Sequence, residues 1–118
     1  MLIRHLDEIS GTERDVQGPG WRSRRLVVAE DGLKYSFHLT TLEEGARLRF
    51  EYRDHRETVY CIEGEGVIED LAAGRKVELG PGRLYSAGIA EPHIITANTP
   101  MSLACVFDPP LQGTEEAD

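Results

Sequence analysis

The chain is short of cysteine, of basic residues and of long apolar runs, and each shortage excludes a class of protein. Two cysteines in 118 residues are too few for a disulfide-based secreted scaffold. The sequence has no apolar run long enough to span a membrane and no apolar signal region at its start, so neither is predicted. Thirteen Lys and Arg against 21 Asp and Glu give a net charge of -8, which argues against nucleic acid and anionic membranes as partners. We therefore expect a cytoplasmic protein.

The length and the positions of the cysteines indicate a small, self-sufficient unit. A chain of 118 residues is expected to form one domain over residues 1–118 and to bury roughly two-thirds of its unfolded surface. Cys61 and Cys105 each lie inside an apolar run. Such positions predict buried thiols in a reducing compartment and no disulfide.

Apolar residues recur with a period of two far more often than with the period of a helix, and turn residues interrupt them about every ten positions. This pattern is typical of an all-β barrel or sandwich. A short helix is expected near residues 6–10. The predicted strands are 24–29, 34–40, 47–53, 58–62, 66–70, 76–79, 83–87, 93–97 and 103–107.

The predicted strand 47–53 shows how the alternation assigns faces. Leu48, Phe50 and Tyr52 fall on one face, and charged residues fall on the other. Successive side chains of a strand point to opposite faces. We therefore expect Tyr52 to point inward and Glu51 and Arg53 to point outward.

Glycines and polar residues between positions 45 and 93 fall at the spacing of the two metal-binding motifs of a cupin barrel, although most of the usual histidines are replaced. The first motif, G-x5-H-x-H-x3-4-E-x6-G, is matched in position by Gly45, Glu51, Arg53, Glu57 and Gly64. In the second motif, G-x2-H, Gly82 is followed by Tyr85, and the nearby imidazole is His93. We therefore predict a jelly-roll-like cupin barrel with a metal set of Glu57, Tyr85 and His93, which leaves coordination positions open for a substrate.

Five segments have the order and spacing of one family within the cupins. They are Trp21-Arg22-Ser23-Arg24-Arg25-Leu26, Tyr35-Ser36-Phe37-His38-Leu39-Thr40, Val59-Tyr60-Cys61-Ile62-Glu63-Gly64-Glu65-Gly66, Pro81-Gly82 with Tyr85, and Cys105-Val106-Phe107-Asp108-Pro109-Pro110. Through them the chain resembles the ectoine synthase family from residue 2 to about residue 115. The resemblance implies a metal-dependent hydro-lyase. In its reaction, the α-amine of Nγ-acetyl-L-2,4-diaminobutyrate attacks the substrate's own acetamide, and loss of water leaves ectoine.

The resemblance also implies a cofactor, a partner and roles for particular residues. It implies a ferrous ion held by Glu57, Tyr85 and His93, although zinc, manganese or cobalt suits the same donors, and it implies a homodimer. Tyr52 and His55 are expected near the metal and, with its three ligands, form the predicted catalytic set. The expected substrate-binding residues are Trp21, Ser23, Arg25, Thr40, Phe107 and Glu115. Among them, Arg25 suits the substrate carboxylate, and Glu115 suits its ammonium group.

Alternatives remain open at this point. Tyr85, His93 and the aromatic residues are also ordinary core residues of a barrel. Residues 90–92, Ala-Glu-Pro, and a tail after Pro110 that is shorter than the family's suggest a related enzyme acting on another amino-acid amide or amidine. A third hypothesis is a non-catalytic cupin that binds a small solute, because a fold does not by itself determine function.

Overall fold

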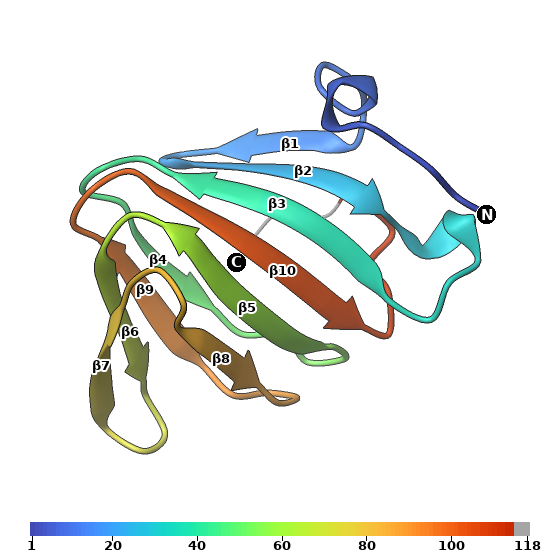
Figure 1. Ribbon diagram of the computed structural model, residues 1–118. Helices are drawn as coiled ribbons and strands as arrows, with labels where there is room; N and C mark the ends of the chain where they lie inside the picture. The colour runs from blue at the N-terminus through green and yellow to red at the C-terminus, as the bar shows by residue number, and fades with distance from the viewer. Residues whose placement is uncertain (115–118) are drawn as a thin grey trace.

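The computed structural model describes residues 1–114 (Figure 1). Two short 3-10 helices, η1 (Leu6–Glu8) and η2 (Ala29–Asp31), lie in the first third of the chain. The strands are β1 (Asp15–Gly18), β2 (Trp21–Val27), β3 (Ser36–Leu42), β4 (Arg47–Phe50), β5 (Arg56–Glu63), β6 (Gly66–Asp70), β7 (Arg75–Leu79), β8 (Leu84–Ala87), β9 (His93–Ala97) and β10 (Met101–Asp108). The prediction of an all-β protein with at most short helices is confirmed.

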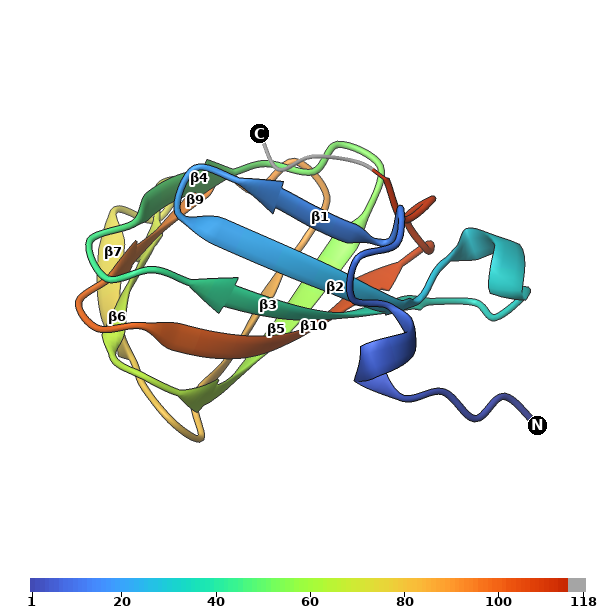
Figure 2. The ribbon, with the colours of Figure 1, turned by 90° about the horizontal axis from the view of Figure 1, so that it is seen from above.

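The strands form two antiparallel sheets that curve around a shared core (Figure 2). The larger sheet has the order β1-β2-β3-β10-β5-β8, and the smaller has the order β4-β9-β6-β7. Alternation along β5 shows how the sequence builds this core, because Val59 and Cys61 are buried while Tyr60 and Ile62 are exposed. Cys61 and Cys105 are free and buried, as predicted. In residues 1–114, no helix is long and apolar enough to cross a membrane.

Every predicted strand has a counterpart in the structure, but several bounds differ: the strand predicted over 24–29 begins at Trp21, the one over 34–40 spans Ser36–Leu42, and the one over 103–107 begins at Met101. Strand β1 was not predicted, because Asp15–Gly18 contains a single apolar residue, Val16. The strand predicted over 47–53 ends at Phe50, since the chain bends at positions 53 and 54. The next strand begins at Arg56, two residues earlier than predicted. Tyr52 therefore lies outside a strand, yet it packs against the core as expected.

The turn between β5 and β6 depends on a glycine that no other residue replaces without cost. Gly64 has a φ of +90°, and a Cβ there would overlap the carbonyl oxygen of Pro100 and lie 2.7 Å from the Cα of Met101. Gly82 has nearly the same φ, +92°, with open space around it. We expect Gly82→Ala to lower the free energy of unfolding by about 1 to 2 kcal/mol through φ alone. Gly64→Ala should cost roughly 2 kcal/mol more because of the overlap. Urea unfolding measures both variants, and equal losses would contradict the steric argument.

Acid stability depends on Asp31, a partly buried carboxylate that pairs with Arg4 of the N-terminal segment. Asp31 accepts hydrogen bonds from Arg4 and Arg14, each at 3.1 Å, and from the backbone of Val28 at 2.9 Å. Burial opposes its ionisation, but these hydrogen bonds outweigh burial and lower the pKa of Asp31 to about 2. The folded pKa is lower than the unfolded pKa, so the stabilisation is present at neutral pH and is lost as the pH falls from about 4 to 2.

We expect Asp31→Asn to lower the free energy of unfolding by about 2 kcal/mol at pH 7, and the difference from the wild type to shrink toward pH 3. Chemical unfolding at several pH values measures this difference. Asp54→Asn, at an exposed position, is the control and should change little. A loss that is the same at pH 7 and pH 3 would rule out the electrostatic explanation.

Candidate functional site

A cavity lies between the two sheets, and most of the predicted site residues face it. Its volume is about 40 Å³, room for only a few water molecules, so a larger ligand requires movement of the side chains around it. The lining residues are Trp21, Ser23, Arg25, His38, Thr40, Leu42, Phe50, Tyr52, Glu57, Val59, Tyr85, Ile95, Leu103, Cys105, Phe107 and Leu111.

The period of the strands explains why these side chains meet. Every second residue of β2, from Trp21 through Ser23 to Arg25, points into the barrel and is buried. Antiparallel pairing places Ser23 opposite Thr40 on β3 and Arg25 opposite His38. Residues that face each other across a strand pair lie close together on one face of the sheet. The pairing therefore builds one polar wall of the cavity.

The three predicted metal ligands converge, although they come from β5, β8 and β9. Glu57 is 5% exposed and His93 is 4% exposed. The Nε2 atom of His93 lies 3.0 Å from Oε1 of Glu57, and the hydroxyl of Tyr85 donates to the same oxygen at 3.4 Å. The rings of Tyr85 and His93 meet edge to face at 5.3 Å. One carboxylate oxygen of Glu57 thus contacts both of the other predicted metal ligands.

The electrostatics of this set indicate a place for a cation. Burial and the nearby Glu57 carboxylate raise the pKa of Tyr85 well above its ordinary value. Burial lowers the pKa of His93, but hydrogen bonds to Glu57 and to the backbone of Glu91 outweigh it, so the net shift is upward. Tyr85 therefore stays a neutral phenol unless another positive charge is nearby, and the Glu57 carboxylate stabilises the charged form of His93.

The hydrogen bonds of His93 provide a geometric test of whether a metal fits. Its Nδ1 lies 2.9 Å from the carbonyl oxygen of Glu91, and its Nε2 faces the Glu57 carboxylate. Both neighbours are acceptors, so either a second proton or a cation must lie on the Nε2 side. A metal-binding histidine commonly donates its other ring N–H to a carbonyl in this way. Among residues 1–114, no three His, Cys, Asp or Glu side chains are grouped to hold a metal, so Tyr85 is needed to complete the set.

The wall that β2 and β3 form suits a polar ligand. Arg25 is 4% exposed, and its Nε donates to the hydroxyl of Ser23 at 3.3 Å. The hydroxyl of Thr40 donates to the same Ser23 oxygen at 3.4 Å, and the thiol of Cys105 donates to Thr40 at 3.7 Å. Burial, with a smaller effect of Glu57, raises the pKa of the Cys105 thiol. This thiol is therefore a packing group and no nucleophile, as the sequence indicated.

Aromatic side chains close the space between the metal set and the polar wall. Tyr52 contacts Phe107 edge to face with 4.9 Å between ring centroids, and it stacks on Phe50 at 6.3 Å. Trp21 is 8% exposed and lies among the core residues. These rings make part of the cavity wall apolar, which strengthens any electrostatic interaction inside it.

Three predicted residues do not line the cavity. His93 contacts Glu57 but lines a neighbouring hollow of about 350 Å³, together with Tyr85. His55 does not line the cavity either, and its Nδ1 lies 2.7 Å from the carbonyl oxygen of Pro109, in the segment that follows β10. Glu115 lies outside the described residues. The roles predicted for His55 and Glu115 remain predictions.

Sequence reasoning missed one polar residue of the cavity. His38 is 2% exposed, lines the cavity and packs on Phe107 with 4.9 Å between the rings. Burial and the nearby charge of Arg25 lower the pKa of His38 to about 3, so the imidazole is neutral at physiological pH. Alternation along the predicted strand 34–40 puts His38 on the same face as Thr40, a predicted substrate-binding residue, so this signal was available in the sequence.

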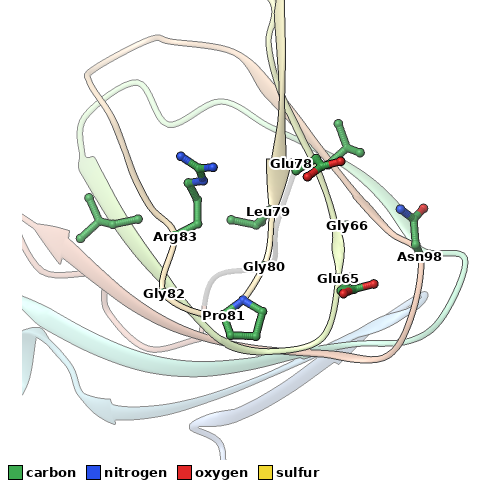
Figure 3. Close-up of a pocket in the computed structure, with 11 residues that line it drawn as sticks. Glu65, Gly66, Glu78, Leu79, Gly80, Pro81, Gly82, Arg83 and Asn98 are labelled. Carbon is green, nitrogen blue, oxygen red and sulfur yellow. The ribbon is translucent and has the colours of Figure 1, made fainter.

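A larger hollow of about 660 Å³ lies elsewhere, beside the turn between β7 and β8 (Figure 3). Figure 3 shows Glu65, Glu78 and Asn98 on one side of this turn and Arg83 on the other. The hollow is open to solvent and contains none of the predicted site residues. The buried cavity, which most of the predicted site residues line, is therefore the better candidate for chemistry.

Comparison with known proteins relates the whole chain to one family. A family model described as ectoine synthase matches residues 1–118. The L-ectoine synthase of Nocardia farcinica is 47% identical over 118 residues, which cover 100% of this chain and 90% of that protein. The crystal structure of ectoine synthase from P. lautus is 40% identical, with a TM-score of 0.91 over 98% of this chain and 83% of that one.

A more distant structure extends the likeness to the superfamily. A sugar phosphate isomerase of the cupin superfamily from Silicibacter pomeroyi is 26% identical, with a TM-score of 0.63 over 76% of this chain and 60% of that one. Together with the closer matches, this likeness confirms the predicted cupin fold.

Proposed function

Because the chain belongs to the ectoine synthase family, a family of hydro-lyases, we propose that it closes the ring of Nγ-acetyl-L-2,4-diaminobutyrate to form ectoine. The observation that carries the proposal is the position of Glu57, which lines the same cavity as Arg25 and Tyr85 and also contacts Tyr85 and His93. Two of the predicted metal ligands, Glu57 and Tyr85, and the Arg25 guanidinium, which can bind a carboxylate, thus line the same cavity. An intramolecular reaction of an amino acid requires this arrangement.

We propose that Glu57, Tyr85 and His93 hold a ferrous ion. Such an ion would supply a Lewis acid that polarises the acetamide carbonyl of the substrate. Glu57 and His93 are already buried and in contact, so they need little rearrangement. The carbonyl oxygen of Glu91 keeps the His93 ring oriented through Nδ1.

On the other side of the cavity, Arg25 binds the substrate carboxylate, and Ser23 and Thr40 surround the same end. The ring closure then forms a bond from the α-nitrogen to the acetamide carbon. The carbonyl oxygen leaves as water with two protons taken from the nitrogens, and a C=N bond remains. Trp21, Tyr52 and Phe107 hold the substrate chain in its folded form and keep bulk water away, because water would compete for the polarised carbonyl. We also propose that Glu115 pairs with the substrate ammonium group and that His55 lies near the metal.

The direct test is an anaerobic assay of iron-loaded protein with Nγ-acetyl-L-2,4-diaminobutyrate, followed by mass spectrometry. Loss of one water from the substrate and formation of ectoine are expected. Parallel loading with zinc, manganese and cobalt shows which metal the site uses. A folded, iron-loaded protein that forms no ectoine would overturn the proposed function.

We also propose that the protein is a homodimer that uses an apolar patch on the outer face of the larger sheet. The patch consists of Tyr60, Ile62 and Leu84, which are 46%, 47% and 56% exposed. Tyr60 and Leu84 are direct partners on β5 and β8, and β8 is an edge strand of its sheet. Edge strands with exposed apolar residues favour pairing with another copy.

We expect Tyr60→Lys to shift the protein toward the monomer in sedimentation experiments, because a charge would be buried in the interface. Leu71→Lys is the control, since Leu71 is exposed at the end of β6, on the smaller sheet. A wild-type monomer, or a Tyr60→Lys dimer as tight as the wild type, would contradict the proposed interface.

A further inference from the structure

The proposed chemistry gives no role to His38, a buried polar residue of the cavity. His38 is 98% buried and lines the cavity. Its Nε2 is buried and has no hydrogen-bond partner among the described residues. A buried polar atom without a partner costs about 1–3 kcal/mol. Because His38 lines the cavity, Nε2 can regain a hydrogen bond when a ligand with a complementary group enters and the side chains around it move.

Its neighbours hold the His38 ring from three sides. In the larger sheet, His38 is the direct partner of Arg25 on β2 and of Cys105 on β10. Its ring packs on Phe107 at 4.9 Å. A side chain fixed in this way offers its free nitrogen to a ligand without a large loss of conformational entropy.

Charge determines what that nitrogen can do. Burial and the adjacent Arg25 charge keep the imidazole neutral. A neutral imidazole has one donor and one acceptor nitrogen, whereas the charged form has two donors. His38 can therefore accept a hydrogen bond at Nε2 when its proton is on Nδ1, and a cationic neighbour such as Arg25 prevents it from becoming a donor at both nitrogens.

We propose that His38 positions the α-amine of the substrate by accepting an N–H hydrogen bond at Nε2 while Arg25 binds the carboxylate. This inference rests on the proposed function. Amine and carboxylate are attached to the same carbon, so a group beside Arg25 is placed to meet the amine. Acceptance of one N–H fixes the direction of the nitrogen lone pair, which must point at the acetamide carbon for ring closure. His38 is thus a positioning residue and not the base that takes the proton.

Two variants separate this role from a structural one. His38→Met keeps most of the volume and removes the acceptor, whereas His38→Gln retains an amide oxygen near the position of Nε2. We expect His38→Met to unfold at the same temperature as the wild type or a higher one, since Nε2 makes no hydrogen bond in the protein. Its kcat/KM should nevertheless fall roughly 10- to 100-fold, and His38→Gln should recover most of the loss.

Binding of two ligands to metal-free protein, measured by calorimetry, is the decisive experiment because it does not depend on turnover. The ligands are the substrate and 4-acetamidobutyrate, which lacks only the α-amine. We expect His38→Met to bind the substrate roughly 10-fold more weakly or worse and to bind 4-acetamidobutyrate as the wild type does. Equal weakening of both ligands, or no weakening of either, would overturn the inference.

If His38→Met does not fold, His38→Gln and His38→Asn replace it, since the shorter asparagine does not reach the position of Nε2. Weaker substrate binding by the asparagine variant alone supports the inference, and equal binding overturns it. Failure of the proposed function is recognised separately. In that case the wild type forms no ectoine in the iron-loaded assay, whatever the His38 variants bind.

Discussion

Glu57→Ala is expected to abolish ectoine formation, with a loss of ~1,000-fold or more in kcat, and to remove stoichiometric metal binding. Glu57 is the group that Tyr85 and His93 both contact, so its loss removes one ligand and the anchor of the other two. Lewis-acid stabilisation contributes several kcal/mol to such a reaction, and each 1.36 kcal/mol corresponds to a factor of ten in rate. Metal analysis of the purified protein and the mass-spectrometric assay measure the two effects.

Two further variants make this result interpretable. Glu57→Gln keeps the shape of the side chain but removes its charge, and it should also lose the metal because a neutral amide is a weaker ligand for iron than a carboxylate. Glu51→Ala is the matched control, since Glu51 occupies a ligand position of the usual cupin motif but pairs with Arg49 away from the cavity. It should keep both metal and activity. Full metal content and turnover in Glu57→Ala would refute the proposed metal set.

Arg25→Met is expected to lower kcat/KM about 100-fold or more, chiefly through a higher KM. Arg25 is a buried cation on the polar wall of the cavity, and hydrogen bonds to charged groups contribute about 1.5–3 kcal/mol each. Arg25→Lys should recover only part of the loss, because an ammonium lacks the planar fork that binds a carboxylate with two hydrogen bonds. Steady-state kinetics with the substrate separates kcat from KM.

The neighbouring Arg22 provides the control for Arg25. It lies on the same strand but on the opposite face, where its Nε and Nη2 donate to Asp15 at 2.9 and 2.7 Å. Arg22→Met should leave KM unchanged and affect only stability. If Arg25→Met kept the wild-type KM while Arg22→Met raised it, the carboxylate site would have to lie on the outer face of the sheet.

The sequence predicted the metal-binding residues but not their contacts. The spacing of Gly45, Glu57, Gly64 and Gly82 indicated Glu57, Tyr85 and His93, since the cupin motif is a pattern of fixed offsets along the chain. The sequence could not show that these residues contact one another, because Glu57 and Tyr85 belong to the larger sheet and His93 belongs to the smaller one. Only the closure of the two sheets brings them together.

His38 illustrates the opposite case. Its inward direction follows from the alternation of the strand, yet a buried histidine in a barrel is usually satisfied by a neighbour. Its significance is that Nε2 has no partner among the described residues while the ring faces the cavity. The absence of a partner is a property of everything around a residue. A linear pattern does not contain it.

The sequence by itself determined the all-β class, the turn positions and the identity of the metal-binding candidates, because backbone alternation and glycine conformations are local properties of the chain. Tertiary structure decided that β1 exists as the edge partner of β2, that Tyr52 leaves its strand but stays in the core, and that His55 contacts Pro109. Pairing, packing and hydrogen bonding act between residues far apart in sequence. These interactions form only when the chain has folded, so a local sequence pattern does not reveal them.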